Sequence, residues 1–238
     1  MNIAVIYAGG MGSRLHNYSR PKQFIEFRSK PIVIYTIEIF QRISAVDGIV
    51  VVCLEDWIPY LRHEVEKYNL DKVLHIVPGG RKGQDSIYNG LVCVKDHYPD
   101  DTMVLIHDGV RPLAMDKTIL ECIEVANEKG NCVVVVPAME TIVVEGENGD
   151  WSVPNRSNCY VARAPQCFRL GDVMAAHRKA LKEEKHDFID TCTMMKYYGY
   201  KFNTILGTAE NIKITTPADC FMFRAIIEAR EEGVVFGL

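Results

Sequence analysis

The fold is decided by residues 2–14, which read Asn-Ile-Ala-Val-Ile-Tyr-Ala-Gly-Gly-Met-Gly-Ser-Arg. The apolar run from Ile3 to Tyr7 has the composition of a buried strand, and glycines follow it at once. Glycine lets the backbone approach a ligand closely, and successive backbone N–H groups form a nest for anions. The stretch therefore predicts an α/β fold with an anion site where the first strand ends.

This glycine turn matches neither of two common nucleotide-binding motifs. A dinucleotide-binding turn reads G-x-G-x-x-G, and Leu15 stands where its last glycine would fall. A P-loop ends in Gly-Lys-Ser or Gly-Lys-Thr, and this turn does not. The pattern thus disfavours a dinucleotide-dependent oxidoreductase, which we keep as an alternative from another class of enzyme.

Basic residues beside the turn favour phosphate binding over a plain connection between strand and helix. Arg14 lies in the turn, and Arg20 and Lys22 follow in the run Arg-Pro-Lys-Gln. Guanidinium and ammonium groups beside a glycine nest suit a triphosphate. A solvated charged loop is the alternative that these residues leave open.

Buried apolar runs alternate with helical patterns along the next hundred or so residues, which is typical of a mostly parallel sheet with helices on both faces. Further strands are predicted at 49–54, 73–77, 103–106 and 133–136. Helices are predicted between them, around 31–40, 57–68, 87–94 and 119–126, with Pro31 at the first helical position.

This rhythm breaks at residues 138–160, where Glu-Gly-Glu-Asn-Gly-Asp separates two short β-like runs. Polar, glycine-containing segments of this kind favour a hairpin. A hairpin that projects from an α/β core is a candidate arm for dimerisation, so we expect a β-arm here.

The last part of the chain returns to helices. We expect helices near 171–184 and 190–197 and a strand at 202–206. Thr216-Pro217 predicts the start of a final helix, as N-cap and first-turn proline. One face of that helix is expected to carry Met222, Ala225, Ile226 and Ala229. Without repeats or a linker, residues 1–238 are predicted to form a single domain.

The composition is that of an ordinary globular protein, with 48% hydrophobic and 24% charged residues among 238. A net charge of −4 argues against a nucleic-acid-binding surface. No apolar run approaches the roughly 20 residues that cross a bilayer. The start of the chain lacks the basic segment and cleavage site of a signal peptide, so we expect a cytoplasmic protein with no nucleic-acid or membrane partner.

The cysteines do not form a recognisable metal or disulfide pattern. None lies in a C-x-x-C pair or at a spacing typical of metal ligands, and most fall within apolar runs. We expect reduced side chains in the core and no zinc site. The eight positions are Cys53, Cys93, Cys122, Cys132, Cys159, Cys167, Cys192 and Cys220.

A second candidate site is the run Ile-His-Asp-Gly-Val-Arg-Pro at 106–112, where a central strand is predicted to end. Ligands of open α/β sheets bind at the carboxyl ends of the strands. Asp108 there could hold a magnesium ion that bridges phosphates, whereas a helix cap or a salt bridge to Arg111 is the structural alternative. His107 is expected to orient the turn rather than to act as a base.

A third signal is Asn-Ile-Lys-Ile-Thr-Thr at 211–216. Its alternation places Lys213 on the face opposite Ile212 and Ile214. An isolated lysine is usually solvated, so this run carries little weight by itself.

Taken in order, these motifs resemble the cytidylyltransferases of the methylerythritol-phosphate and ribitol-phosphate pathways, from residue 3 to about residue 225. The resemblance rests on Ala-Gly-Gly-x-Gly-x-Arg, Pro-Lys-Gln, Gly79-Gly80 with Ser86, Asn89-Gly90-Leu91, His-Asp-x-x-Arg-Pro, Thr141, Arg156, Pro165-Gln166-x-Phe168 and Asn-Ile-Lys-Ile-Thr. It implies a Rossmann-like nucleotidyltransferase fold, a homodimer formed through the β-arm, and a reaction of CTP with Mg²⁺.

The resemblance also implies roles for individual residues. Cytidine and ribose would contact Ala8, Gly9, Gly10, Gly80 and Ser86. Arg14, Lys22 and Lys213 would surround the triphosphate as the catalytic cations, and Asp108 would hold the metal. The polyol phosphate would meet Asp108, Arg111, Asp190 and, from the partner's arm, Thr141 and Arg156.

The residues themselves are compatible with that chemistry. The attacking group would be a phosphate oxygen that is already anionic at neutral pH, so no general base is required. The sequence accordingly offers no convincing Ser-His-Asp or Cys-His set. Catalysis would consist of bringing two polyanions together and stabilising the charge around the α-phosphate.

Three positions depart from the family pattern. Gly83 stands where arginine is usual, and Arg81 could substitute from the other side of the turn. Glu140 replaces an aspartate, and Ile189 replaces a threonine before Asp190. These changes leave the nucleotide-binding half of the pattern mostly intact, but they weaken the match in the acceptor-binding half. A CTP-binding regulator without turnover therefore stays an alternative.

The acceptor is predicted from two segments. Pro154-Asn155-Arg156 with Val143-Val144, together with His-Asp-Gly-Val-Arg, is more similar to the ribitol-phosphate branch. We therefore expect D-ribitol 5-phosphate as the acceptor, with 2-C-methyl-D-erythritol 4-phosphate or another alditol phosphate as the alternative.

Overall fold

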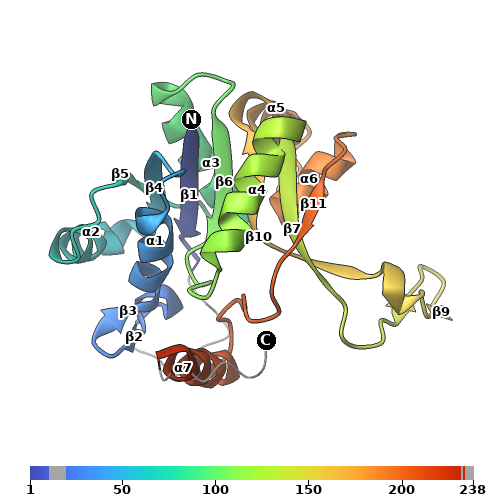
Figure 1. Cartoon of the computed structure of the whole chain (residues 1–238). Coiled ribbons are helices and arrows are strands. Elements are labelled where there is room, and N and C mark those ends of the chain that lie inside the picture. The colour runs from blue at the N-terminus through green and yellow to red at the C-terminus, as the bar shows by residue number, and fades with distance from the viewer. Residues whose placement is uncertain (11–19, 232, 234–238) are drawn as a thin grey trace.

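The protein is built around a mixed, mostly parallel sheet of seven strands. The computed structural model describes residues 1–10, 20–231 and 233. The strand order is β11-β7-β10-β6-β1-β4-β5, and β10 alone among these runs antiparallel to its neighbours (Figure 1). The strands are β1 (Asn2–Ala8), β4 (Gly48–Cys53), β5 (Val73–Pro78), β6 (Met103–Asp108), β7 (Asn131–Pro137), β10 (Tyr160–Arg169) and β11 (Thr204–Leu206).

Helices cover both faces of this sheet. One face packs against α1 (Ile32–Arg42), α2 (Ile58–Lys67) and α4 (Asp116–Lys129). The other packs against α3 (Gly83–His97), α5 (Leu170–Lys182) and α6 (Thr191–Tyr197). Since successive side chains of a strand point to opposite faces, β1 sends Ala4 and Ile6 into the first core and Ile3 and Val5 into the second.

The last helix, α7 (Pro217–Glu231), lies across the edge where the parallel strands end, below the sheet in Figure 1. Its start agrees with the prediction, because Thr216 Oγ1 accepts from the Asp219 N–H at 3.4 Å. The predicted inner face was wrong in part, since Met222 is half exposed and Phe223 is buried instead. Phe223 packs on Ile32, Val110, Leu113 and Ile214, a third apolar cluster that lies outside the sheet.

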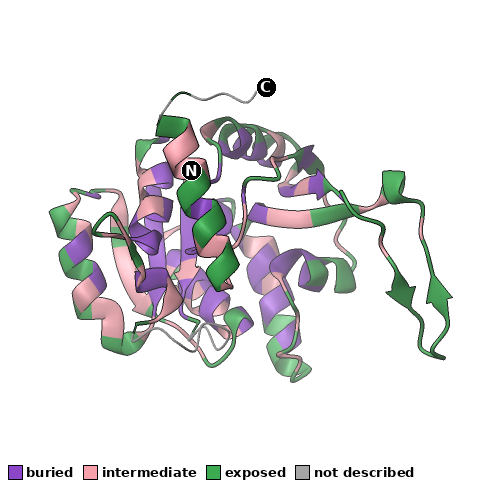
Figure 2. Ribbon diagram, turned by 90° about the horizontal axis from the view of Figure 1, so that it is seen from below, coloured by how far each residue is buried: buried purple, intermediate pink, exposed green. Residues whose placement is uncertain are grey.

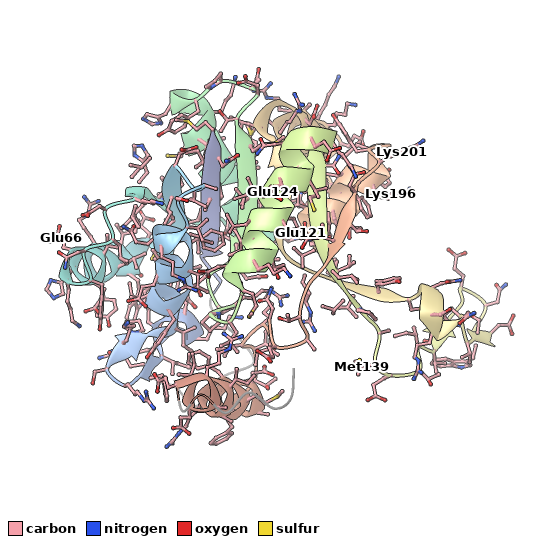
Figure 3. All side chains as sticks on the ribbon, viewed as in Figure 1. Glu66, Glu121, Glu124, Met139, Lys196 and Lys201 are labelled. Carbon is pink, nitrogen blue, oxygen red and sulfur yellow. The ribbon has the colours of Figure 1, made fainter. Side chains whose placement is uncertain are left out.

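Residues 138–160 form the predicted arm. Its tip is a small hairpin of β8 (Val144–Glu145) and β9 (Trp151–Ser152) around the polar turn. The arm stands clear of the body and is almost wholly exposed (Figures 1 and 2). Met139, near the start of the arm, is 75% exposed (Figure 3). Apolar side chains exposed on such a projection are typical of an interface.

Most predicted elements are confirmed, with two further differences. Pro31 is the N-cap of α1 rather than its first helical residue. Strand β10 was missed, because Arg163 and Pro165 interrupt its apolar pattern and its pairing shifts register between Ala162 and Gln166. Short elements complete the description: η1 (Lys22–Phe24), β2 (Glu26–Phe27), β3 (Lys30–Pro31), η2 (Glu55–Trp57) and η3 (Arg156–Asn158).

None of the helices within the described ranges has both the length and the apolarity that a bilayer crossing requires.

Candidate active site

Two strands meet at the centre of the candidate site. Strands β1 and β6 are parallel neighbours, and their register sets Tyr7 beside Asp108 at their carboxyl ends. The turn after β6 packs on β1, with the Gly109 N–H donating to Tyr7 O at 2.9 Å. A Cβ at position 109 would lie 2.8 Å from that of Ala8, so only glycine allows this approach.

Asp108 is a buried carboxylate held between two cations. Its Oδ1 lies 2.5 Å from Lys213 Nζ, and its Oδ2 accepts from Arg111 Nε at 2.8 Å. The side chains of Asp108 and Arg111 are 6% and 9% exposed, whereas that of Lys213 is 39% exposed. The side chain of Lys213 is therefore the more accessible of the two cations, while that of Arg111 stays in the interior.

The cations determine the charge state of Asp108. Burial acts to raise the pKa of this carboxyl, but the nearby charges of Lys213 and Arg111 outweigh it and hold the pKa well below its usual range. The neighbouring phenol responds in the opposite sense, since burial and the negative charge of Asp108 raise the pKa of Tyr7. Asp108 is thus ionised and Tyr7 is a neutral hydrogen-bond donor.

The segment that carries Lys213 is fixed from both sides. Ile214 N donates to Val110 O at 2.9 Å, and Arg111 Nη1 donates to Asn211 O at 2.9 Å. Asn211 Nδ2 in turn donates to Ala164 O at 2.7 Å on β10. Ile214 is fully buried, so the predicted alternation is confirmed and Lys213 faces the site.

His107 has the orienting role that was predicted. It is fully buried, and its Nε2 lies 3.2 Å from Arg111 O, so the proton sits on this nitrogen and is donated to the carbonyl. Burial lowers the pKa of His107 to about 4, which keeps the ring neutral. The contact closes the 108–111 turn.

The two glycine turns touch each other beside this cluster. A Cβ at Gly9 would lie 2.9 Å from Ser86 Oγ and 3.3 Å from Gly79 Cα. Ser86 is 2% exposed, and its hydroxyl accepts from Gly80 N at 3.0 Å and donates to Lys82 O at 3.1 Å. Ser86 therefore shapes the turn from within.

The first turn is held from its own side by Gln23 of the Pro-Lys-Gln motif. Its buried amide donates to Ala8 O at 2.6 Å and to Gly10 O at 3.2 Å. Lys22, the preceding residue, starts the short helix η1 beside this turn. Arg14, the other predicted cation of the loop, lies outside the described residues.

Two adjoining pockets open at this edge of the sheet. They share Tyr7, Ile87, Ile189, Asp190, Thr191 and Lys213. The first pocket continues over the start of α3 and the 186–188 segment, with Lys82, Gly83, Gln84, His177, His186, Asp187, Phe188 and Met194. The second continues towards β6 and β10, with Ile106, Asp108, Arg111, Ala162, Arg163, Ala164 and Gln166.

The departures from the family pattern all lie at these pockets or on the arm. Gly83 is the first residue of α3 and a Cβ there would meet nothing within 4 Å, so space remains where an arginine side chain is usual. The cation that lines the pocket beside it is Lys82, which pairs with Asp187, whereas Arg81, which could have substituted, does not line the pocket. Ile189 is 90% exposed at the shared mouth of the pockets.

The arm residues do not join the site within one chain. Thr141 and Arg156 are exposed, and Arg156 Nη1 donates to Met139 O at 3.3 Å within the arm. Glu140 is exposed beside Thr141. These residues belong to the arm, which stands clear of the sheet (Figure 1), and none of them lines either pocket.

Three residues of the site were missed by the sequence prediction. Tyr7 was read only as part of a strand, and Arg163 was hidden in the unrecognised strand β10. Gln166 belongs to a quoted motif, but its role appears only in the structure, where it accepts from Cys192 N at 2.9 Å and donates to Asp190 Oδ2 at 3.3 Å. It thereby fixes the start of α6, whose N-cap is Asp190.

The donor set suits a metal that arrives with a phosphate. Asp108 and Asp190 both line the second pocket, and each carboxylate already faces donors from the chain. Magnesium in phosphoryl-transfer sites is typically held by one or two carboxylates together with substrate phosphate oxygens. Asp108 fits that role.

Known proteins resemble this chain over nearly its whole length. A sequence profile described as IspD, 2-C-methyl-D-erythritol 4-phosphate cytidylyltransferase, matches residues 2–229. The chain belongs to this family. The ribitol-5-phosphate cytidylyltransferase of Vibrio parahaemolyticus is 44% identical over 238 residues, the whole of both chains. The 2-C-methyl-D-erythritol 4-phosphate cytidylyltransferase of Clostridium botulinum is 37% identical over 228 residues, 95% of this chain and 97% of that one.

A solved structure agrees. The 4-diphosphocytidyl-2C-methyl-D-erythritol synthase of Anaerococcus prevotii has a TM-score of 0.82 at 25% identity and covers 95% of this chain and 96% of its own. The predicted family and fold are therefore confirmed. The protein is a cytidylyltransferase, a CTP-dependent nucleotidyltransferase.

Replacing Asp108 tests the charge cluster of this cytidylyltransferase. Asp108→Asn leaves Arg111 buried beside a neutral amide, and we expect a loss of about 3–5 kcal/mol in the free energy of unfolding, measured by urea denaturation. The matched control is Asp116→Asn, because the Asp116–Arg42 pair is exposed and such pairs contribute about 0–1 kcal/mol. Equal losses in the two variants would contradict the account.

The same comparison has a predicted pH dependence. Folding lowers the pKa of Asp108 from its ordinary value of 3.8, so its contribution to stability is complete above that value and is lost as the pH falls through the lower folded pKa. The difference between wild type and Asp108→Asn should therefore shrink below about pH 4.

Proposed function

We propose that this protein transfers CMP from CTP to D-ribitol 5-phosphate, giving CDP-ribitol and pyrophosphate. The observation that carries the choice of acceptor is the 44% identity, over its full length, to a ribitol-5-phosphate cytidylyltransferase. The corresponding relative named for methylerythritol phosphate is 37% identical. The second candidate acceptor is 2-C-methyl-D-erythritol 4-phosphate, which the matching family description favours.

The chemistry is an in-line displacement at the α-phosphorus of CTP. An oxygen of the acceptor phosphate forms a bond to this phosphorus, and the bond to the oxygen that bridges to the β-phosphate breaks. The electron pair leaves with pyrophosphate, and no proton needs to be removed from the attacking oxygen. The protein's part is therefore positioning and charge stabilisation.

The cations on the chain divide between the two substrates in this proposal. Lys213 presents a half-exposed ammonium at the mouth of both pockets, and Lys22 lies at the first glycine turn. These two, with Arg14, would surround the triphosphate, while Ala8, Gly9, Gly10 and Gly80 would present backbone to the nucleoside. Ser86 would act by holding the second turn.

The second pocket has the character of an acceptor-phosphate site. Arg163 lines it, and its Nε is buried without a hydrogen-bond partner among the described residues. Burial, and then the positive charge of Arg111, lowers the pKa of this guanidinium. A phosphate dianion there would supply the missing acceptor, with Asp190 and Thr191 close to the polyol chain.

Magnesium is part of the proposal. It would neutralise charge on the triphosphate and polarise the α-phosphate, which is the chemistry that such an ion supplies. Asp108 would hold it. Lys213, which pairs with Asp108, would lie beside the same phosphates.

The arm supports a homodimer in which each subunit completes its partner's site. It exposes Met139, Val143, Val144, Trp151 and Val153, a set of apolar side chains with no cover in one chain. In the proposed dimer Thr141 and Arg156 reach the acceptor phosphate of the partner subunit. A cytoplasmic location is consistent with soluble substrates of this kind.

Acceptor preference can be measured directly. Pyrophosphate release from CTP and Mg²⁺ should be followed with ribitol 5-phosphate and with methylerythritol 4-phosphate in parallel. We expect turnover with ribitol 5-phosphate and little or none with the other, because the chain is 44% identical over its full length to a ribitol-5-phosphate cytidylyltransferase. Turnover with methylerythritol 4-phosphate alone would show that this compound is the acceptor instead. Thermal stabilisation by CTP without any release of pyrophosphate would indicate a CTP-binding regulator.

Arm exchange can be tested by mixing inactive variants. Arg156→Ala and Lys213→Ala should each be inactive. After joint unfolding and refolding, about half of the dimers should be mixed and should carry one complete site, which gives about a quarter of wild-type activity. Activity that stays at the level of the single variants would show that Arg156 serves the site of its own chain or none.

A further inference from the structure

A cluster of metal-ligand side chains lies away from the candidate active site. It consists of His75 on β5, the edge strand of the sheet, with Cys93 and His97 on the last turns of α3. Cys93 is six residues beyond Ile87, the residue of α3 that lines both pockets, so about 9 Å of helix separates the cluster from the pockets. None of the three lines either of the pockets described above.

The three side chains point towards one another. Each offers a ligand atom, and these atoms all lie within 4.8 Å of each other. The rings of His75 and His97 are 4.3 Å apart between centroids and are inclined by 33°. Ligand atoms of a tetrahedral zinc ion lie about 3.3–3.6 Å apart, given Zn–N near 2.0 Å and Zn–S near 2.3 Å. Small side-chain rotations would therefore bring the three atoms to that spacing, and His97 is exposed enough to move.

The protonation of His97 is already suited to a metal. Its Nδ1 lies 2.8 Å from Cys93 O, and because a carbonyl can only accept, Nδ1 carries the proton. Nε2 is then the nitrogen with the free lone pair. Histidine ligands of metals commonly donate their other N–H to a backbone carbonyl in this way, which fixes the ring.

The surroundings favour a cation. Asp96 lies close enough to act electrostatically on Cys93, where burial and then this carboxylate raise the pKa of the thiol. Lys95, the nearest lysine along the helix, pairs with Asp100 at 2.7 Å. A bound metal would displace the proton of the Cys93 thiol, because a thiol that coordinates a metal is deprotonated despite its raised pKa.

We propose that His75, Cys93 and His97 form a binding site for a thiophilic divalent cation, Zn²⁺. One thiolate and two imidazoles are the ligands that zinc prefers, and three protein ligands leave a fourth position for water. Binding releases the thiol proton of Cys93 to solvent. This proposal departs from the sequence prediction of no zinc site. Cys93 and His97 are four residues apart on one helix, and His75 joins them only through the fold.

Such a site would fasten the edge of the sheet to the helix that packs on it. Strand β5 ends at Pro78 and α3 begins at Gly83, so the two elements hold the 79–82 turn between them. A metal that ties β5 to α3 at their far ends would stabilise the frame of this turn without touching the substrates.

Cobalt provides the test, because Co²⁺ replaces Zn²⁺ and its thiolate bond gives a near-ultraviolet charge-transfer band. Untagged, chelator-treated protein is titrated with Co²⁺ and then with Zn²⁺. We expect one Co²⁺ per chain, a band that Zn²⁺ abolishes, and a higher melting temperature with Zn²⁺. Cys93→Ser should remove the band, and His97→Gln should weaken binding at least about tenfold, since even indirect ligand contacts are worth about 10–100-fold.

Two matched variants serve as controls. Cys159→Ser removes another half-buried thiol, and His63→Gln removes an exposed histidine outside the cluster. Both should bind Co²⁺ as the wild type does. A band that persists in Cys93→Ser, or binding unchanged in His97→Gln, would overturn the proposal, as would the absence of a band in the wild type. The exposed His97 variant keeps the test decisive if Cys93→Ser fails to fold.

Discussion

A buried carboxylate between two cations is the constraint on which the rest of this cytidylyltransferase depends. Asp108 ends the central strand β6, Arg111 belongs to the turn that follows, and Lys213 comes from the distant segment that leads into α7. The charges can be buried because they compensate one another, since an unpaired charge in this position would be strongly destabilising. The cluster therefore joins the sheet to the C-terminal part of the chain at the edge where the two pockets open.

In the proposed function, the same cluster prepares the site for anions. Two highly charged substrates must approach each other, so the chain has to present several cationic side chains without letting their mutual repulsion destabilise the fold. Asp108 holds Lys213 in position with the lysine partly exposed, and Arg111 remains behind it in the interior. Around them the backbone of the glycine turns, fixed by Gln23 and Ser86, supplies further donors. Fixed donors of this kind stabilise a transition state without reorganising during the reaction.

Local patterns were sufficient for much of this architecture. The strand before Gly9, the alternation of strands and helices, the hairpin arm and the ends of β6 and 211–214 were all recognisable from apolar spacing and turn residues. Asp108 and Lys213 could be singled out by position, although their contact could not, because it joins segments about a hundred residues apart.

What the sequence did not reveal depends on non-local pairing. Strand β10 runs antiparallel between β6 and β7, and its Arg163 and Pro165 break the pattern that marks a buried strand. The inner face of α7 was misplaced, because Phe223 fills a cluster made by the 110–113 turn and Ile214 rather than by the sheet. The His75–Cys93–His97 cluster likewise exists only once β5 is set beside α3.

The most direct test of the central claim is the rate of nucleotidyl transfer after Lys213→Met. The account predicts a fall in kcat of about 100-fold or more, as for loss of one fixed donor, with CTP still raising the melting temperature. Lys201→Met, which removes an exposed lysine beyond α6 (Figure 3), should transfer CMP at the wild-type rate. A Lys213→Met enzyme that is as fast as the wild type would contradict the account.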